Sequence, residues 1–552
     1  MNYKAFKLRT LLPTRNYDTI LAAIAGFLII YAFSHHGGIG VSPDSVVYIS
    51  VAGNIHDHGT ITDFTKGPMM DFPAFYPIFL CGAMFLTGLQ CIQFGAALNG
   101  ILFAALIFLS GWIMERFSFR SKWYKWTLLC FIVFSPCLLE VYSMLWSETL
   151  FLLLLLVFLY CCRRYFQSPS TGSLLLMAFV AGLACVTRYA GITFIGTGGL
   201  LILCDTRPAF AKKIRDIILF ALSASVFLAI NLVRNRLVTG TLTGYREKGV
   251  TPFLTNLHDF GNVFCDWLPL SNNQYDWGGL VGLFWILFFI AAFVFRLVKR
   301  YRVFTYENIA TAYFIVYAVF ILFTSTFSRF QPLDSRLLSP LFIPWIWGAT
   351  CWIPTWIAAW APYRRTFVII AAVVAAIAFQ VGQLLDDYDT WDGIRDAGIP
   401  GYTENDWQRS ETMNYVRQHK AMLQKPGSTL YSNAEDGIWF LTGARADMIP
   451  HKDFPKDVNE FLAEDHFYIV WFNDGVNPDL LSIPFIATHK KLSSEQIFND
   501  GAVYLFTTDS ATRRNRTDTT GLRSRTDTTA LRGRIDSSAI HSRTDTTNLH
   551  PR

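Results

Sequence analysis

The feature that most constrains this chain is a series of apolar runs, each long enough to cross a lipid bilayer as a helix. A membrane-spanning helix needs about 20 predominantly apolar residues, and such runs recur along the first two thirds of the sequence. Hydrophobic residues make up 52% of the chain and charged residues 16%, against roughly 25% charged in a soluble domain. The fold class predicted is therefore mainly α, a polytopic transmembrane bundle of about 11 spans. The runs lie at 18–36, 97–114, 126–143, 146–162, 174–188, 190–204, 216–237, 279–296, 307–327, 337–358 and 366–385.

The distribution of Lys and Arg predicts the orientation. Basic residues near span ends face the cytoplasm, and with eleven crossings all six basic clusters fall on one side. A further apolar stretch, 74–90, is preceded by Pro73 and contains Pro77, so we interpret it as juxtamembrane or re-entrant. The chain is expected to be a multi-pass protein of the cell (inner) membrane with its N-terminus in the cytoplasm. The clusters are Lys4–Arg15, Arg116–Lys125, Arg163–Arg164, Arg207–Arg215, Arg296–Arg302 and Arg364–Arg365.

Beyond the last apolar run, the pattern changes to that of a small α/β domain outside the cytoplasm. A polar helix is predicted at 405–420, followed by strand-like runs at 428–431, 467–472 and 502–506. The end of the chain holds four nine-residue polar repeats that cannot bury a core. The predicted organisation is a cytoplasmic N-terminus (1–17), a transmembrane domain (18–385) with a first outside loop (37–73), an extracytoplasmic α/β domain (386–510) and a disordered repeat tail (511–552).

Four charged residues lie where predicted spans meet the outer surface, and ionisable groups there are candidates for function. Asp44 follows Ser42-Pro43 at a predicted helix start, where it could be a simple cap or an ionised group favoured by the helix dipole. Glu148 opens an apolar run, Arg188 lies between two runs, and Arg336 could pair locally with Asp334.

An ordered set of motifs resembles the C-superfamily (GT-C) membrane glycosyltransferases. This group includes the protein O-mannosyltransferases, the aminoarabinose transferases and the lipopolysaccharide-core galacturonosyltransferases. The resemblance covers roughly residues 15–510. Two positions depart from the family pattern: Ser45 stands where a second acidic residue is frequent, and Ala74 replaces the second proline of a Pro-Pro pair. The motifs are Asp44…Tyr48, Phe72–Pro77, Ser147–Phe151, Thr187-Arg188, Arg336–Pro340 and Tyr431–Gly443.

The resemblance implies an inverting transferase that moves a sugar from a polyprenyl-phosphate carrier to an acceptor hydroxyl outside the cytoplasm. Asp44 matches the general base, which removes the acceptor proton. Arg336, and less well Arg188, match groups that stabilise the leaving phosphate. Glu148 matches a second acidic position that orients the acceptor or holds a divalent cation, and Tyr48 is expected to contact substrate.

Three other classes remain open: a lipid-linked glycan transporter or flippase, a polysaccharide polymerase or ligase, and a membrane scaffold. No repeat between the two halves favours a transporter. No nucleotide-binding motif, metal-spaced Cys/His cluster or nucleic-acid signature is present, and His56 and His58 lack a third ligand nearby in sequence. The expected partners are the lipid-linked sugar, a lipid, glycan or protein acceptor, and membrane lipids. The sugar and the acceptor are not specified by the sequence.

Overall fold

The computed structural model describes residues 16–118, 121–244, 248–268, 277–299, 304–329, 331–353, 362–473 and 477–508. The chain forms two compact units. One comprises Met1–Gln424 with Ala434–Asp447, and the other comprises Lys425–Asn433 with Met448–Arg552. The predicted repeat tail and most of the predicted cytoplasmic N-terminus lie outside the described residues. We call the two units the membrane unit and the small unit.

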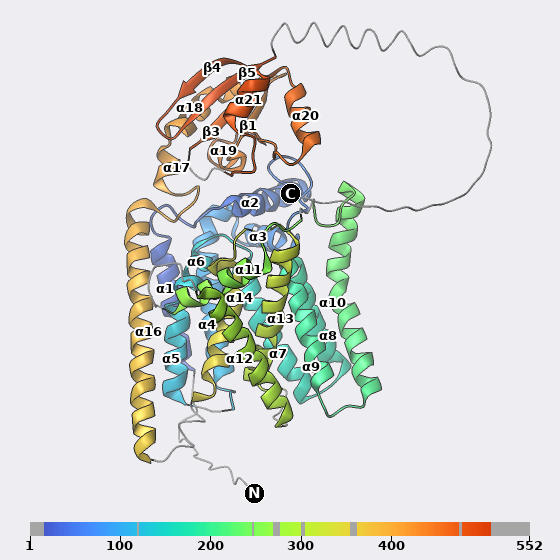
Figure 1. The fold of residues 1–552 in the computed structure, drawn as a ribbon, viewed down its shortest axis with the longest axis vertical. Coiled ribbons are helices and arrows are strands. Elements are labelled where there is room, and N and C mark those ends of the chain that lie inside the picture. Colours follow the sequence, from blue (N-terminus) through green and yellow to red (C-terminus); the bar gives the residue numbers. More distant parts are fainter. Residues whose placement is uncertain are drawn as a thin grey trace, which may run out of the picture. The chain divides into compact units, whose positions relative to one another are not determined.

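The membrane unit is built from helices (Figure 1). Its helix α16 continues to Ala397, so the predicted domain boundary at 386 falls inside a helix. The predicted polar helix is present as α17 and α18, and both belong to the membrane unit. The elements are α1 (Tyr17–Phe33), α2 (Pro43–His58), α3 (Phe75–Thr87), α4 (Cys91–Met114), α5 (Lys122–Val133), α6 (Pro136–Ser143), α7 (Glu148–Gln167), α8 (Thr171–Thr187), the 3-10 turn η1 (Tyr189–Gly191), α9 (Ile192–Cys204), α10 (Phe210–Thr239), α11 (Phe253–Trp267), α12 (Gly278–Val298), α13 (Tyr306–Phe327), α14 (Ser335–Thr350), α16 (Pro362–Ala397), α17 (Asn405–Arg409), α18 (Glu411–Leu423) and α19 (Glu435–Thr442).

Every predicted apolar run contains a helix, but the helices differ in length. Six described helices (α4, α7, α10, α12, α13 and α16) are long and apolar enough to cross a bilayer. The pair α5 and α6 makes a seventh candidate, bent by 46° at the break before Pro136. The helices α1, α3, α8 and the η1–α9 segment are apolar but shorter. The multi-pass architecture is confirmed, whereas the count of about eleven spans remains a prediction.

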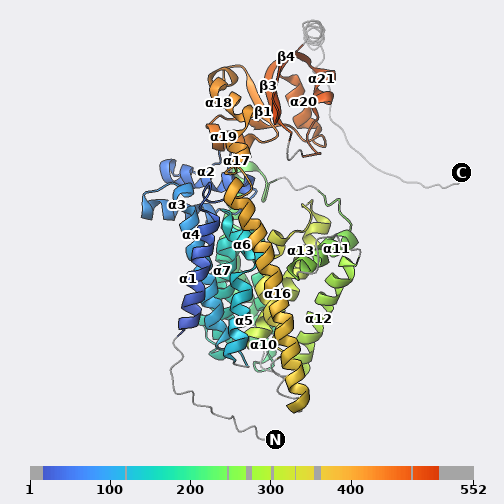
Figure 2. The same cartoon turned by 90° about the vertical axis from the view of Figure 1, so that its left-hand side faces the viewer.

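Helix α3 occupies most of the apolar stretch 74–90. Its 13 residues give a helix about 20 Å long, shorter than the ~30 Å hydrocarbon core. Within the membrane unit, α2 and α3 lie across the ends of the longer helices (Figure 2). This arrangement agrees with a stretch that does not cross fully.

Burial distinguishes the centre of the bundle from its edges. Helices α7 and α13 are the most buried of the long helices, and α16 is the least. In Figure 1, α16 and α10 lie at opposite edges of the membrane unit. The apolar surface of α16 that faces outward is the surface expected to contact lipid.

The small unit contains a mixed sheet in the order β2-β1-β3-β5-β4. Strand β1 pairs in parallel with β3, and the other long strands pair antiparallel, with an irregularity near Leu492. Tyr431, Phe467 and Phe506 pack in its core with the helices α20 and α21. The elements are β1 (Thr429–Ser432), β2 (Asp447–Met448), α20 (Pro455–Ala463), β3 (His466–Phe472), α21 (Ile483–His489), β4 (Lys491–Ile497) and β5 (Gly501–Thr507). The three predicted strand-like runs correspond to β1, β3 and β5.

Candidate active site

Helix α2 places Asp44 near its N-terminus without using it as the cap. Ser42 is the N-cap residue, and its backbone N–H donates to the hydroxyl of Ser45 at 3.1 Å. Ser45, which stands where the family often has a second acid, therefore stabilises the helix start. The carboxylate of Asp44 is left available to interact with other elements.

The start of α2 is held against the loop between α6 and α7. Gly40 forms a parallel bridge with Met144, with its N–H donating to the carbonyl of Ser143 at 2.9 Å. A Cβ on Gly40 would collide with the Met144 sulfur. From α4, the Asn99 amide donates to the carbonyls of Tyr142 and Met144 at 2.8 and 2.7 Å. These bonds fix the loop that carries the next acidic residue.

Four predicted residues meet in one ion-paired cluster, which we call the charged cluster: Asp44, Glu148, Arg188 and Arg336. The guanidinium of Arg336 pairs with Asp44, and its Nε donates to Glu148 Oε1 at 2.6 Å. Arg188 pairs with the same carboxylate of Glu148. Two carboxylates and two guanidiniums from four distant parts of the chain thus form one connected, formally neutral set.

The two carboxylates differ in exposure. The Glu148 side chain is 1% exposed, and the Asp44 side chain is 28% exposed. Glu148, at the first position of α7, is surrounded by its arginines. Asp44 is therefore the more accessible of the two carboxylates.

Neighbouring side chains surround the charged cluster. Tyr48 lies one turn after Asp44 on α2 and is buried. Its hydroxyl is 3.2 Å from that of Ser147, which accepts from Arg188 at 3.3 Å. Burial raises the pKa of Tyr48 well above its usual range, so its phenol is neutral. The predicted Tyr48 position therefore borders the cluster as a hydrogen-bonding group.

Trp146 supports the arginine that links the two carboxylates. The guanidinium carbon of Arg336 lies 3.9 Å from the Trp146 ring centroid, a cation–π geometry. The indole N–H donates to Ser42 Oγ at 2.7 Å. Trp146 thereby joins the start of α2 to Arg336.

Arg336 reaches the cluster because Asp334 is occupied elsewhere. Asp334 is the N-cap of α14, and its carboxylate accepts from the Leu337 N–H at 2.8 Å. Burial raises the pKa of Asp334. The Tyr317 hydroxyl donates to the carbonyl of Leu337 at 2.8 Å, which ties α14 to α13. Asp334 therefore caps helix α14 rather than pairing with Arg336. Arg336 pairs with Asp44 and Glu148 instead.

The cluster does not fit a divalent cation. The two arginines bind one oxygen of Glu148, and the other lies within hydrogen-bonding distance of the Ser147 hydroxyl. Two guanidiniums there would repel a metal ion. Among the described residues, no group of three His, Cys, Asp or Glu side chains has metal-binding geometry. His56 instead contacts Asp57 beside it.

The later part of the motif Tyr431–Gly443 forms helix α19, which packs against α2 within the membrane unit. The Tyr402 hydroxyl donates to Asp436 at 2.8 Å. The backbone of Tyr402 in turn donates to the carbonyl of Val41 at 2.8 Å. Gly401 makes this approach possible, since its φ of +120° is unfavourable for other residues and a Cβ would meet the Val41 carbonyl. Burial raises the pKa of Glu435, beside Asp436, to about 8.

Arg234, which is not among the predicted site residues, holds the loop 37–73 in place. It lies on α10 and donates to the backbone carbonyls of Met69 and Ile61 at 2.6 and 2.8 Å. Tyr189 adds a bond to the carbonyl of Met70 at 3.2 Å. The available signal was a single Arg near the end of an apolar run, the feature that had identified Arg188.

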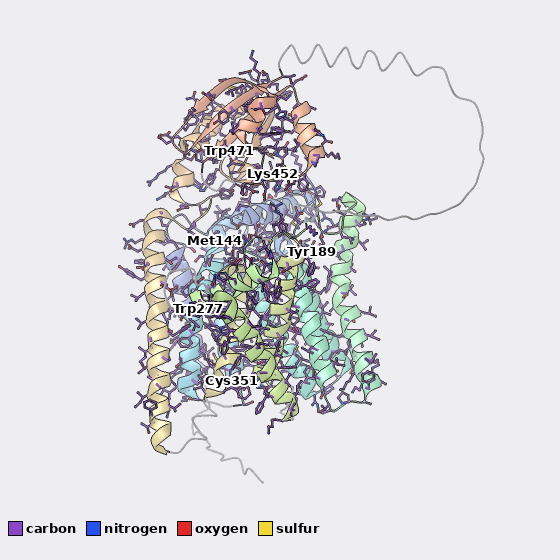
Figure 3. All side chains as sticks on the ribbon, in the orientation of Figure 1. Met144, Tyr189, Trp277, Cys351, Lys452 and Trp471 are labelled. Atoms are coloured by element: carbon purple, nitrogen blue, oxygen red, sulfur yellow. The ribbon has the colours of Figure 1, made fainter. Side chains whose placement is uncertain are left out.

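Labelled side chains show the level of these elements in the bundle. Met144 and Tyr189 lie toward the end crossed by α2, and Cys351 lies toward the other end (Figure 3). The charged cluster is built from residues next to the first two positions, so it belongs to the α2 end of the membrane unit.

No protein-family model and no curated protein matches the sequence, but the fold is similar to solved structures. The crystal structure of ArnT from Cupriavidus metallidurans bound to undecaprenyl phosphate has a TM-score of 0.53 and 13% identity, covering 89% of this chain and 98% of that chain. The archaeal oligosaccharyltransferase AglB from Archaeoglobus fulgidus, in complex with an inhibitory peptide and a dolichol-phosphate, has a TM-score of 0.49 and 10% identity over 82% of this chain and 69% of that chain. The likeness to ArnT extends over nearly all of both chains, and it shows that this chain has the GT-C glycosyltransferase fold indicated by its motifs.

Proposed function

We propose that this protein transfers a sugar from a polyprenyl-phosphate carrier to an acceptor hydroxyl at the extracytoplasmic face, with inversion at the anomeric carbon. The observation that carries the proposal is the charged cluster, in which the accessible carboxylate of Asp44 pairs with Arg336, and Glu148 links Arg336 to a second arginine, Arg188. This arrangement supplies a proton acceptor and an anion-binding pair in one place. The ArnT structure was obtained with a polyprenyl phosphate bound, which agrees with such a donor.

In the proposed reaction, Asp44 accepts the proton of the acceptor hydroxyl. The acceptor oxygen forms a bond to the anomeric carbon while the bond from that carbon to the phosphate oxygen breaks. The electron pair of the broken bond leaves on the polyprenyl phosphate, which changes from a diester to a monoester. Arg336 and Arg188 stabilise this developing negative charge.

The pairing of Arg336 with Asp44 gives the donor phosphate a second role. A phosphate that binds the guanidinium competes with the Asp44 carboxylate for it. Because Arg336 also holds Glu148 through Nε, it stays in place when Asp44 is released. Donor binding is thus expected to free the base for the acceptor.

The position of the charges supports an enzyme rather than a transporter. Asp44 lies at the start of α2, Glu148 at the start of α7, and Arg188 at the end of α8. A transporter places its substrate site near the middle of broken membrane helices. The cluster at helix ends agrees better with chemistry at one membrane face.

The test uses the purified full-length chain, a radiolabelled polyprenyl-phosphate sugar and candidate acceptors. Asp44→Asn is expected to lower the transfer rate by about 10²–10⁴-fold, the usual contribution of a general base. Asp57→Asn is the matched control, because Asp57 lies on the same helix with a side chain that is 59% exposed. Equal transfer by the Asp44→Asn and Asp57→Asn proteins would remove Asp44 from the mechanism.

A further inference from the structure

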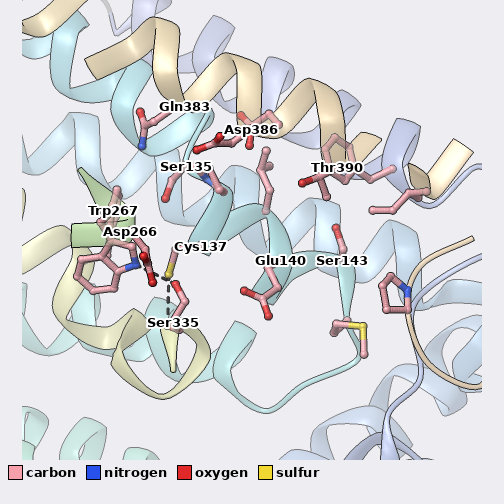
Figure 4. A pocket seen from close by; sticks show the side chains of 18 of the residues that line it. Ser135, Cys137, Glu140, Ser143, Asp266, Trp267, Ser335, Gln383, Asp386 and Thr390 are labelled. Carbon is pink, nitrogen blue, oxygen red and sulfur yellow. Dashed lines mark hydrogen bonds between the residues drawn. The ribbon is translucent and has the colours of Figure 1, made fainter. Parts of the chain in front are cut away.

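A cavity of about 800 Å³ lies beside the charged cluster in the membrane unit. It is enclosed by α6, the C-terminal end of α11, the start of α14 and the later turns of α16 (Figure 4). The reaction described above uses none of the carboxylates in it. We call it the acidic cavity because several carboxyl groups line it.

Four carboxylates line the cavity, and none of the described lining residues is basic. They come from three helices: α6 contributes Glu140, α11 contributes Asp266, and α16 contributes Asp386 and Asp387. In Figure 4 the Glu140 carboxylate points into the open space. The cavity thus has an acidic lining without a basic side chain among its described residues.

Three buried polar groups in this lining lack hydrogen-bond partners among the described residues, and one of them is the hydroxyl of Ser143, which is 2% exposed. The Asp387 side chain is 8% exposed, and its Oδ2 has no partner among the described residues. One turn earlier, Gln383 is 2% exposed, and its Oε1 likewise has none among them. The oxygens of Asp387 and Gln383 can accept a hydrogen bond, and the Ser143 hydroxyl can accept or donate one. Buried acceptors are normally satisfied, so these positions suit a ligand that brings donors.

The acidic lining favours a ligand whose hydrogen-bond donors carry a positive charge. Ionised carboxyl groups repel a phosphate, whereas a bound cation favours their ionised form. A protonated primary amine offers three N–H donors and no acceptor, so it matches carboxylate and amide oxygens together. The lipid phosphate of the sugar donor is thereby assigned to the arginines rather than to this cavity.

The remaining walls are apolar. Phe33, Leu139, Met144, Phe342 and Ile394 contribute to the lining, so a bound molecule must also carry apolar groups. On the outward surface of α16, Leu384, Leu385 and Tyr388 are exposed. An amphiphile fits both properties, since its head can reach the carboxylates and its tail can follow apolar surface.

Two residues connect the cavity to the charged cluster. Trp146 lines the cavity and also packs on the Arg336 guanidinium. Ser335 lines it too and directly precedes Arg336 in the chain. A headgroup in the cavity therefore borders the reaction centre.

We propose that the acidic cavity is the acceptor site, and that the acceptor is an amphiphile whose headgroup carries a protonated amine beside the hydroxyl that receives the sugar. This assignment rests on the proposed glycosyl transfer and names the class of its second substrate. The amine binds the carboxylates and the unpartnered amide oxygen, while the hydroxyl is presented toward Asp44.

The test measures binding to the full-length chain in lipid nanodiscs. The probe is hexyl glucosaminide, which has a free amine, compared with its N-acetylated analogue. We expect the free amine to bind and the N-acetylated compound to bind at least about tenfold more weakly, because a charged hydrogen bond is lost. The double variant Glu140→Gln/Asp387→Asn should weaken binding of the free amine by at least about tenfold.

Asp392→Asn is the matched control, since Asp392 lies on the same helix α16, pairs with Arg395 and is not part of the cavity lining. Its binding should equal that of the unmodified chain. Three results would overturn the acceptor site: no binding of the free amine, equal binding of both compounds, or displacement of the free amine by undecaprenyl phosphate. In Asp44→Asn, binding should persist while transfer is lost. Retained transfer there would refute the role of Asp44 without affecting the cavity.

Discussion

The charged cluster and the acidic cavity are adjacent and share Trp146, but they differ in the basic side chains that surround their carboxyl groups. In the cluster, Glu148 is enclosed by Arg188 and Arg336. In the cavity, Glu140 has no basic side chain beside it among the described lining residues. Opposite charges that are paired hold a fixed geometry, whereas carboxyl groups without a basic neighbour can bind a cationic group. The difference distinguishes the proposed reaction centre from the proposed acceptor site.

The largest expected effect is a loss in the free energy of unfolding when Glu148, rather than Glu140, is replaced. Glu148→Gln leaves two arginines without their shared carboxylate, and breaking a buried ion pair costs about 3–5 kcal/mol. Glu140→Gln should be neutral or slightly stabilising, because it removes an unpaired charge. Chemical unfolding of the two variants in matched detergent measures both. A similar cost for the two would contradict the comparison.

Arg336→Lys tests the linking role of the guanidinium. Lysine retains the charge but cannot bind Asp44 and Glu148 as a planar fork. We expect transfer to fall by about 10²-fold, as when one group that stabilises developing charge is removed. The rate constant kcat should fall more than the donor KM rises. Arg395→Lys, at an exposed ion pair, is the control. Wild-type kcat in Arg336→Lys would show that geometry at this position is irrelevant.

Asn99→Ala tests the loop that both regions share. The variant leaves the carbonyls of Tyr142 and Met144 without their amide donor, at a cost of about 1–3 kcal/mol. Both transfer and cavity binding should weaken, because Met144 lines the cavity and precedes Trp146. Loss of only one activity would show that the two regions are supported independently.

The smallest effect concerns pH. Burial raises the pKa of Asp266 above its usual value, so the folded state binds this proton more tightly than the unfolded state does. Stability from this group is therefore present at low pH and decreases as pH rises through the raised pKa. Asp266→Asn should flatten the decrease in unfolding midpoint as pH rises above about 4, the pKa of an ordinary Asp side chain. An unchanged slope would show that Asp266 is already paired.

Much of this architecture follows from the sequence. Apolar periodicity located the helices because lipid requires internally satisfied backbone over long runs. Ionisable residues at the ends of membrane spans are costly unless they are paired or functional. This cost is why four such residues were predicted as candidate site residues: Asp44, Glu148, Arg188 and Arg336. The structure brings all four together. Their catalytic and binding roles, and the membrane orientation, remain predictions.

Other features depend on tertiary contacts that no local pattern records. The acidic cavity combines Glu140, Asp266 and Asp387 from three helices far apart in sequence, so their proximity could not be read from spacing. The sequence around Asn99 shows only a polar residue in an apolar helix. Its role depends on the carbonyls of Tyr142 and Met144, which are more than 40 residues away in the chain. The polar continuation of α16 to Ala397, beyond its apolar part, likewise could not be read from the apolar pattern.

The bonds between residues 39–41 and 402–403 have a consequence for how the protein is made. The Tyr402 N–H and the Thr403 hydroxyl donate to the carbonyls of Val41 and Ile39, so the segment before Asp44 is secured by residues synthesised some 360 positions later. During translation, these bonds cannot form until residues 402–403, which follow helix α16, have been synthesised. The backbone before Asp44 therefore reaches its final form only after the helices from α1 to α16 have been made.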